Sequence, residues 1–586
     1  MPVPDLASAQ FSGHAPHVQR PAPPVTGPLE QRLPVVMFTV VAALILYKFF
    51  LVQRLNINWD EFFYLNHVHA VSRGDGGPLL QRFQTHLFGW LTSLQGDEIR
   101  QIAAARSVMV GLLALTTWLV WRLGRIWLHG FAASIPPFVY IASVPVMVHG
   151  GSFRADSLLA PLTVAALLFL FLPHHSRARD AAAGAALGLA FAITIKTALA
   201  APLVLAALAA RTGTAPTQDD ALLRRLVSDS AWIASVAAIS AATLIAFHWM
   251  AIGNASVGST IALGTSSASR TLVEVPWFPR GSTLLIYADW QPLFWCLLFV
   301  GAIAALLSRR FDVASLGLAL LPVAFYRNAF PYYYVVMLAP ASILAGYAVQ
   351  QVIALVRPKV SNWVTSALLA TIWIGLLYQG LGHTSRLMVD DQMVQRMLLS
   401  GIHRIFPEPV NYVDRCGMVP TFRKVNFFMS TWGMENYRRR GEPFLPSAIR
   451  DHQPAFVLVN APALNPKTSG DRGLLPRDRE LIANYYPRYW GPVRVAGAKG
   501  TVGPSESVTL HVPFADRYRI EATAPIKVDG MLRRDGDVID VPASGVVVQA
   551  PTSSSTSVVT SVTLFLAAAA PPPADELPLW PLFTGL

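Results

Sequence analysis

Residues 34–61 read PVVMFTVVAALILYKFFLVQRLNINWDE. The part up to residue 53 is almost uninterruptedly apolar, and about 20 such residues in a helix cross the roughly 30 Å hydrocarbon layer of a membrane. The adjacent acids Asp60 and Glu61 follow directly. Two carboxylates at a membrane boundary are costly unless they are solvated or paired. The stretch therefore predicts a membrane helix that delivers an acidic pair to one surface of the membrane.

Similar apolar runs recur as far as residue 380. Only 14% of the 586 residues are charged and 53% are hydrophobic, whereas soluble proteins carry about a quarter charged residues. We predict about eleven spans for an α-helical polytopic membrane domain over 34–380. They cover approximately 34–53, 102–121, 131–149, 157–173, 181–195, 197–210, 231–250, 290–308, 312–330, 332–356 and 362–380.

Short basic loops set the predicted orientation. They contain Arg122 and Arg125, Arg177 and Arg179, Arg211 with Arg224 and Arg225, Arg309 and Arg310, and Arg357 with Lys359. Loops rich in Lys and Arg stay in the cytoplasm. The alternate loops and everything after 380 are then outside, which predicts a multi-pass protein of the inner (plasma) membrane with a cytoplasmic N-terminus.

The apolar stretch 181–210 has Arg-rich flanks at both ends. Both flanks should therefore be cytoplasmic, which requires an even number of crossings. We predict a short hairpin with Lys196 near its outer tip.

The remaining segments differ in composition and in residue pattern. Residues 1–33 are rich in Pro and polar groups and predict a disordered cytoplasmic tail. Residues 381–490 mix helix and strand patterns, which predicts an extracytoplasmic α/β region. Short alternating runs over 491–569 predict a β-sandwich, jelly-roll-like in form. Residues 570–586 form a Pro-rich tail that we expect to be mobile.

Two charged motifs are candidates for catalysis. Asp60 and Glu61 could supply a general base that takes a proton from a hydroxyl, or they could be acids that cap a first helical turn. Arg154 could clamp a phosphate, with Asp156 orienting it, or Arg154 and Asp156 could form a structural ion pair.

Three further sites add cations and aromatic rings. Lys196 stands alone among apolar residues, as a functional residue or as a lysine that reaches back to the interface. Arg327 is flanked by tyrosines that include Tyr332 and Tyr333, although aromatic belts also place tyrosines at such boundaries. Arg280 lies in another predicted outer loop. All of these groups fall on the outer side, a combination that suits the activation of a hydroxyl and the neutralisation of an anionic phosphate leaving group.

Other functions lack support in the sequence. The net charge of +12 resides largely in the loops, without the basic stripe and stacking aromatics that single-stranded nucleic acid requires, so we expect no nucleic-acid partner. Two cysteines, Cys296 and Cys416, do not make a disulfide framework. Phosphate-loop, dinucleotide and HExxH motifs are missing. We therefore expect no cofactor and assign no metal ligand, while a divalent metal stays open.

The order of these motifs resembles the glycosyltransferase C superfamily over roughly residues 34–360. The motifs are Trp59-Asp60-Glu61 followed by Gly74, Ala104-Ala105-Arg106, Arg154-Ala155-Asp156-Ser157-Leu158, Thr194-Ile195-Lys196-Thr197-Ala198 and Pro331-Tyr332-Tyr333-Tyr334. The superfamily includes protein O-mannosyltransferases, aminoarabinose transferases and lipopolysaccharide galacturonosyl transferases. The MIR-type repeats of the eukaryotic mannosyltransferases have no counterpart here.

The resemblance implies an enzyme that moves a sugar from a polyprenyl-phosphate donor to an acceptor hydroxyl, usually with inversion. Its partners would be that lipid-linked donor, membrane lipid and a glycan, lipid or protein acceptor. It implies Asp60 as the base and Glu61 as its neighbour in the acceptor site. Arg154, Lys196, Arg327 and Tyr332 would hold the donor phosphate, and Asp156, Arg280 and Tyr333 could contact substrate. A transporter or flippase of a lipid-linked saccharide, or a non-catalytic assembly protein, is the alternative.

Overall fold

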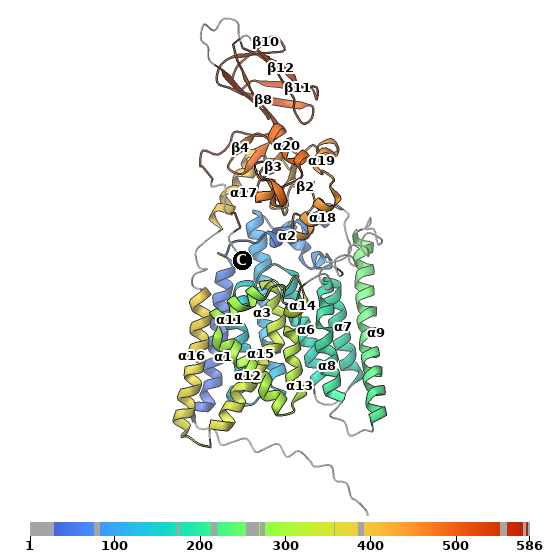
Figure 1. Cartoon of the computed structure of the whole chain (residues 1–586), viewed down its shortest axis with the longest axis vertical. Helices are drawn as coiled ribbons and strands as arrows, with labels where there is room; N and C mark the ends of the chain where they lie inside the picture. The colour runs from blue at the N-terminus through green and yellow to red at the C-terminus, as the bar shows by residue number, and fades with distance from the viewer. Residues whose placement is uncertain are drawn as a thin grey trace, which may run out of the picture.

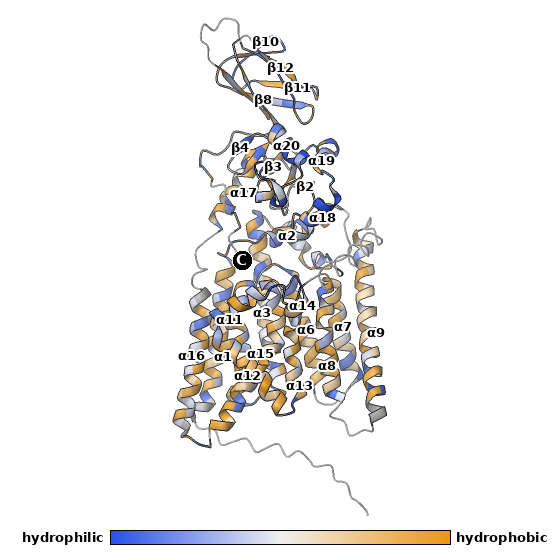
Figure 2. Cartoon of the chain, viewed as in Figure 1, coloured by the Kyte–Doolittle hydropathy of each residue, from blue (hydrophilic) through white to orange (hydrophobic). Residues whose placement is uncertain are grey.

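A computed structural model describes residues 28–75, 82–172, 176–212, 219–252, 269, 276–356, 358–384, 392–504, 506–550, 559–577 and 582–583. A bundle of apolar helices carries an α/β domain at one end, and a β-sandwich lies beyond that domain (Figure 1). Apolar residues dominate the bundle, and polar residues gather in the α/β domain (Figure 2).

The bundle contains α-helices and short 3-10 helices (η). They are α1 (Pro28–Val52), α2 (Trp59–Ser72), η1 (Phe83–Ser93), α3 (Glu98–Gly124), η2 (Gly130–Ser134), α4 (Ile135–Ala142), α5 (Val144–His149), α6 (Ala155–Phe171), α7 (Arg177–Ile193), η3 (Ile195–Ala200), α8 (Ala201–Thr212), α9 (Asp219–Ile252), α11 (Gly281–Trp290), α12 (Pro292–Leu307), α13 (Phe311–Ala314), η4 (Ser315–Leu320), α14 (Pro322–Phe325), η5 (Pro331–Tyr333), α15 (Tyr334–Val356) and α16 (Asn362–Thr384).

Six described helices are long and apolar enough to cross a membrane, or seven if α11 and α12, bent by 107°, count as one span. The predicted number of about eleven is not confirmed. One reason is that the expected span 131–149 is broken at Ser143, whose extended backbone separates α4 from α5. The expected span 312–330 is likewise divided into α13, η4 and α14, with Pro322 opening the last piece.

The predicted hairpin around Lys196 is present. Helices α7 and α8 are joined by η3, and their far ends meet at one carboxylate, because Arg177 and Arg211 both pair with Asp229 of α9 at 3.1 and 2.8 Å. Gly184 and Gly188 of α7 face α9 so closely that an added Cβ would lie 2.8 and 2.5 Å from its backbone oxygens. The turn of the hairpin therefore points Lys196 away from this ion-pair network.

The α/β domain follows α16. It contains helices α17 (Met393–Ile405), α18 (Thr431–Arg440), α19 (Leu445–His452) and α20 (Pro476–Tyr485), the 3-10 helices η7 (Pro462–Leu464) and η8 (Gly470–Arg472), and strands β1 (Asn411–Val413), β2 (Arg423–Lys424), β3 (Phe456–Leu458), β4 (Arg488–Trp490) and β5 (Val493–Val495). The strand order is β2-β1-β3-β5-β4. Strands β2, β1 and β3 are parallel, and β5 and β4 are antiparallel to their neighbours.

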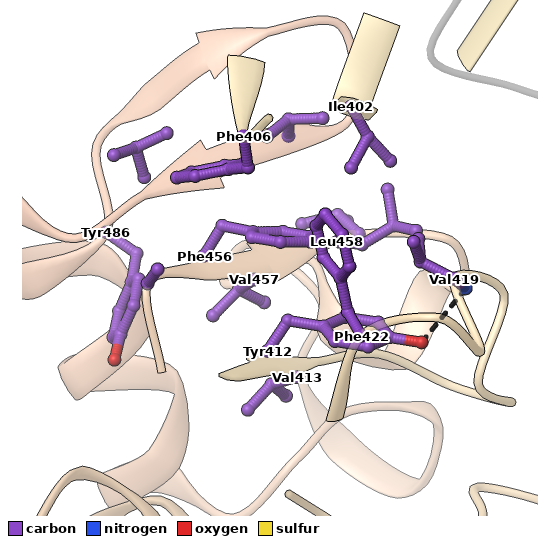
Figure 3. Packing of buried hydrophobic residues seen from close by; sticks show 14 of the residues in the cluster. Ile402, Phe406, Tyr412, Val413, Val419, Phe422, Phe456, Val457, Leu458 and Tyr486 are labelled. Atoms are coloured by element: carbon purple, nitrogen blue, oxygen red, sulfur yellow. Dashed lines mark hydrogen bonds between the residues drawn. The ribbon is translucent and has the colours of Figure 1, made fainter. Parts of the chain in front are cut away.

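Stacked aromatic rings form the core of this domain (Figure 3). Phe456 of β3 lies between Phe406 and Tyr412, with ring centres 4.9 and 5.1 Å away. The Tyr412 hydroxyl accepts a hydrogen bond from the Val419 amide at 2.9 Å. Burying these rings in one stack fixes the sheet against α17.

The second β region consists of two four-stranded antiparallel sheets, ordered β10-β9-β12-β7 and β11-β8-β13-β6. The strands are β6 (Gly497–Val502), β7 (Ser507–Leu510), β8 (Asp516–Ala522), β9 (Ile526–Val528), β10 (Met531–Arg533), β11 (Val538–Val541), β12 (Val546–Gln549) and β13 (Thr560–Leu566). Alternate residues such as Tyr518 and Ile520 of β8 and Val546 and Val548 of β12 are buried. This is the period-2 pattern of strands that cover a core with one face.

Both predicted tails differ from expectation where they are described. Helix α1 begins at Pro28, inside the segment 1–33 that we predicted to be disordered, and positions 1–27 lie outside the described residues. In the Pro-rich tail, Leu582 is 1% exposed. Its carbonyl accepts hydrogen bonds from Asn56 and Gln395, and the Phe583 ring packs edge-on against Trp59. The tail therefore returns from the sandwich to the start of α2.

Candidate active site

Helix α2 presents the acidic pair from its first turn. The Asn58 side chain caps the helix by accepting a hydrogen bond from the Asp60 amide at 3.0 Å, and the Asn58 amide donates to Glu61 at 3.1 Å. This reciprocal arrangement is a capping box. It fixes the direction in which the neighbouring Asp60 and Glu61 side chains leave the helix, and the two acids meet different partners.

Glu61 is buried and saturated with hydrogen bonds. Arg106 of α3 donates to both of its oxygens at 2.8 and 2.5 Å, and the Phe153 amide donates at 2.8 Å. Burial alone would raise the pKa of Glu61, but the charge and hydrogen bonds of Arg106 outweigh it and hold the pKa below its usual value. Arg106 also donates to carbonyls that follow α1, such as that of Leu55 at 2.8 Å. Glu61 and Arg106 thus bind α1, α2 and α3 together.

Asp60 points instead to Arg154, the residue that precedes α6. The Arg154 guanidinium donates a hydrogen bond to the Asp60 carboxylate and lies 3.5 Å above the centre of the Tyr332 ring. Arg154 is 5% exposed, whereas the Asp60 side chain is 19% exposed. A nearly buried arginine therefore holds a carboxylate that solvent can still reach.

Asp156 and Lys196 extend the same chain of charges. The Lys196 ammonium donates to Asp156 at 2.9 Å and lies 5.0 and 5.7 Å from the centres of the Tyr332 and Tyr333 rings. Asp156 also faces the Arg154 Nε at 3.6 Å, and neither of those two atoms has a hydrogen-bond partner in the described part of the chain. The sequence Asp60–Arg154–Asp156–Lys196 alternates in sign and carries no net charge.

Arg415 of the α/β domain adds a further cation. Its guanidinium lies 3.7 Å from the centre of the Trp59 ring, next to Asp60, and its buried Nε has no hydrogen-bond partner among the described residues. With Arg415 included, the cluster has an excess positive charge. Such a cluster is suited to an anionic ligand.

Arg280 and Arg327 lie elsewhere. The Arg280 side chain donates to the Arg327 carbonyl at 3.3 Å, and its guanidinium stacks on the Phe330 ring. Arg327 pairs with Glu435 of α18 at 2.6 Å and lies over the Trp432 ring. Arg327 therefore joins the helical bundle to the α/β domain, Arg280 supports the Arg327 segment, and neither makes a described contact with Asp60.

Sequence reasoning missed several groups around the cluster. Lys48 is fully buried in α1 and donates to the carbonyls of Met147 and Val148 at the end of α5, at 2.5 and 2.9 Å. His149, beside Tyr332, has a buried Nε2 without a hydrogen-bond partner in the described regions. Lys48 lies inside an apolar run, and this pattern could have marked it as a candidate functional residue. Nothing in the sequence pointed to Arg415, which lies far along the chain.

The described residues contain no group of three or more His, Cys, Asp or Glu side chains that could hold a metal ion. The cluster itself offers a carboxylate, several cations and tyrosine rings, which suit proton transfer and the binding of an anion.

No protein-family model and no curated protein sequence matches the chain. Its fold is similar to that of solved membrane glycosyltransferases. ArnT from Cupriavidus metallidurans bound to undecaprenyl phosphate aligns with a TM-score of 0.50 at 17% identity, covering 72% of this chain and 92% of ArnT. The apo state of the same ArnT aligns with a TM-score of 0.51 at 16% identity, over 79% and 97% of the two chains. The apo oligosaccharyltransferase from Archaeoglobus fulgidus gives 0.53 at 14% identity, over 78% and 73%.

These alignments span most of each protein. They confirm the resemblance that the order of charged motifs predicted. The chain has the fold of the glycosyltransferase C superfamily.

Proposed function

We propose that this chain is a membrane glycosyltransferase that moves a sugar from a polyprenyl-phosphate donor to the hydroxyl group of an extracytoplasmic glycan, lipid or protein. The single observation that carries the proposal is the Asp60–Arg154–Asp156–Lys196 cluster, built over Tyr332. It joins a solvent-accessible carboxylate to cations in a fold that a solved relative uses with undecaprenyl phosphate bound. The α/β domain, the sandwich and the C-terminal tail then lie outside the cytoplasm, in the orientation that the positive-inside rule favours.

In the proposed reaction Asp60 is the general base. An acceptor hydroxyl gives its proton to the Asp60 carboxylate, and its oxygen forms a bond to the anomeric carbon. The bond from that carbon to the phosphate oxygen breaks, and its electron pair leaves with the polyprenyl phosphate. A single displacement of this kind inverts the anomeric centre.

The cations have two partners in this scheme. Without donor, Arg154 and Lys196 are neutralised by Asp60 and Asp156. A donor phosphate competes with Asp60 for the Arg154 guanidinium, because phosphate and carboxylate both match its planar fork. Binding of donor therefore releases the Asp60 carboxylate for the acceptor, and the arginine stabilises the phosphate as it leaves.

Glu61 has a supporting role in this proposal. Its oxygens are occupied by Arg106 and by backbone amides, so it positions α2 and does not contact acceptor. Arg327 positions the α/β domain above the bundle through Glu435, and Arg280 supports the segment that carries Arg327. Arg415 and Tyr332 complete the surface that faces the phosphate.

The sandwich contributes a separate module. Its two sheets pair the eight strands in the interleaved order of a jelly roll, and we propose that it is one.

The test compares envelope glycans and lipids by mass spectrometry in cells with the chain, cells without it, and cells with Asp60→Asn. A mass deficit of one sugar, shared by the deletion and the Asp60→Asn variant, identifies the reaction and its acceptor. An unchanged set of glycans in the deletion contradicts the proposal. A deficit in the deletion that Asp60→Asn fully restores favours a transporter, since transport requires no base.

A further inference from the structure

A cavity of about 370 Å³ opens on the α/β domain beside α18. Its walls include Phe427, Tyr437 and Phe444, which pack on one another with ring centres 5.2 to 6.0 Å apart. Arg440 and Glu442 stand at its rim and are exposed. The cavity is at the lower end of the size range of small-molecule sites, which are largely apolar with a few polar groups.

The wall is held in place by contacts that do not depend on a ligand. The Tyr437 hydroxyl donates to the buried carboxylate of Asp478 at 2.5 Å and accepts from the Leu475 amide at 2.8 Å. Gly433 lets α18 approach the Phe428 carbonyl, because an added Cβ would lie 1.9 Å from that oxygen. The aromatic surface is thus preformed, which lowers the cost of binding.

The rim sets the chemical class of the occupant. Arg440 and Glu442 form no hydrogen bond or ion pair with other described residues, so both are available to a ligand. A cation donates and a carboxylate accepts hydrogen bonds, which suits hydroxyl groups because each hydroxyl does both. Glu442 would repel a phosphate, and a lipid tail would offer no hydrogen-bond partner to Arg440 or Glu442. Apolar ring faces combined with a donor and an acceptor at the rim match a sugar ring, with its C–H faces and its hydroxyl edge.

The cavity is connected to the proposed active site through α2. Phe428, another residue of the wall, stacks on Phe63 at 3.9 Å, and Phe63 lies one helical turn after Asp60. Figure 1 shows α18 next to α2, where the α/β domain meets the helical bundle. A glycan held in the cavity can therefore extend along α2 toward Asp60.

We infer that the cavity formed by Phe427, Phe428, Tyr437 and Phe444, with Arg440 and Glu442 at its rim, is a sugar-binding site. Its use as the subsite that holds a glycan acceptor rests on the proposed function, whereas sugar binding itself does not. The saccharide class that it takes is a neutral ring that exposes one apolar face.

The test measures binding of free saccharides to the full-length chain in detergent by ligand-observed NMR. The probes are disaccharides to tetrasaccharides of glucose, galactose, mannose or arabinose at millimolar concentration, with glycerol as the small polyol control. We expect at least one series to bind and glycerol not to bind. Glu442→Gln and Arg440→Gln should each weaken binding about tenfold, as expected for loss of one hydrogen bond to a charged group. Both side chains are exposed, so these variants fold.

Glu480→Gln and Arg477→Gln are the matched controls, because Glu480 and Arg477 are an exposed acid and an exposed cation on α20 outside the cavity. They should bind sugar like the original chain. The inference is overturned if no saccharide binds, or if the rim variants bind as well as these controls.

The failure of this inference is separable from failure of the proposed function. Asp60→Asn should leave sugar binding unchanged, because Asp60 is not part of the cavity. Intact sugar transfer in Asp60→Asn cells together with rim-dependent sugar binding would remove the proposed reaction and leave the binding site standing. Loss of sugar transfer in Asp60→Asn cells, together with no saccharide binding to the chain, would support the proposed reaction and exclude the sugar-binding cavity.

Discussion

The guanidinium of Arg154 donates a hydrogen bond to the carboxylate of Asp60 across 94 positions of the sequence. The arginine is nearly buried and the aspartate is partly exposed. A carboxylate held by a cation in this way is restrained until an anion competes for the cation. Donor and acceptor would then act in order, donor first.

Asp60→Asn should reduce sugar transfer about 10²- to 10⁴-fold, the usual contribution of a general base. Donor binding should persist or tighten, because Arg154 no longer has a charged competitor. Turnover and donor affinity measured on the purified chain check this expectation. Asp516→Asn, an exposed change in the sandwich, is the control, and full turnover in Asp60→Asn would exclude Asp60 as the base.

Arg154→Lys should weaken donor binding about 10- to 100-fold although the charge is kept. Lysine lacks the planar fork that contacts a phosphate in two places and stacks on Tyr332. The measurement is donor affinity in detergent. Arg122→Lys removes another arginine that lies over a ring, that of Trp118, and should leave affinity unchanged. Equal affinities in the two variants would contradict a phosphate role for Arg154.

Glu61→Gln should lower the stability of the folded chain and should not affect the chemical step directly. It leaves the buried Arg106 without its carboxylate, a change that costs about 3–5 kcal/mol in buried pairs. Because the pKa of Glu61 is lowered on folding, the ion pair stabilises above the unfolded pKa of about 4.5, and that stability is lost as pH falls through the folded pKa. Thermal melting should show the loss, partly recovered in the double variant with Arg106→Gln. A stable but inactive Glu61→Gln chain would instead restore a catalytic role.

His403 links the α/β domain to the bundle and should make this junction sensitive to pH. Burial opposes its charge, but the hydrogen bond at 3.0 Å and the negative charge of Glu98 raise its pKa above 6.5. A raised pKa contributes stability that is fully present below the unfolded pKa and is lost as pH rises through the folded pKa. Melting temperature should therefore fall across that window. His403→Gln should flatten this dependence, and an unchanged slope in the variant would rule out His403 as its source.

Phe583→Ala should loosen the start of α2. Its ring centre lies 6.0 Å from that of Trp59 and 6.2 Å from that of Phe62, and each aromatic pair contributes about 0.5–1.5 kcal/mol. Hydrogen exchange of the α2 amides should accelerate, and turnover should fall while donor affinity stays constant. Phe311→Ala, which changes an exposed phenylalanine at the start of α13, provides the comparison. Unaltered exchange in α2 would show that the tail does not support it.

Much of the cluster could be predicted because ionisable residues are rare among apolar runs. Burying a charge in a membrane costs free energy, so charged residues at such positions are candidates for a functional site. The structure brings four of them into one cluster: Asp60, Arg154, Asp156 and Lys196. The order of crossings around Lys196 followed from arginines at both ends of its hairpin.

Other features depend on contacts that the local sequence does not contain. Arg327 resembled a site residue, but its partner Glu435 is 108 positions away in another domain. Glu61 resembled a catalytic acid, although Asn58 three residues earlier already indicated a capping box. The predicted number of about eleven spans is not confirmed, because hydropathy alone does not show where Ser143 and Pro322 interrupt a helix.

The hydrogen bond from Asn56 to the Leu582 carbonyl, which spans 526 positions, has a consequence for biosynthesis. The ribosome produces Asn56 early and Leu582 after the membrane helices, the α/β domain and the sandwich. The bundle can insert while the chain is still growing, but α2 acquires its final neighbours only after the last of these segments has been made. A chain whose synthesis stops after the sandwich would contain the bundle, the α/β domain and the sandwich, but α2 would lack its contacts with Leu582 and Phe583.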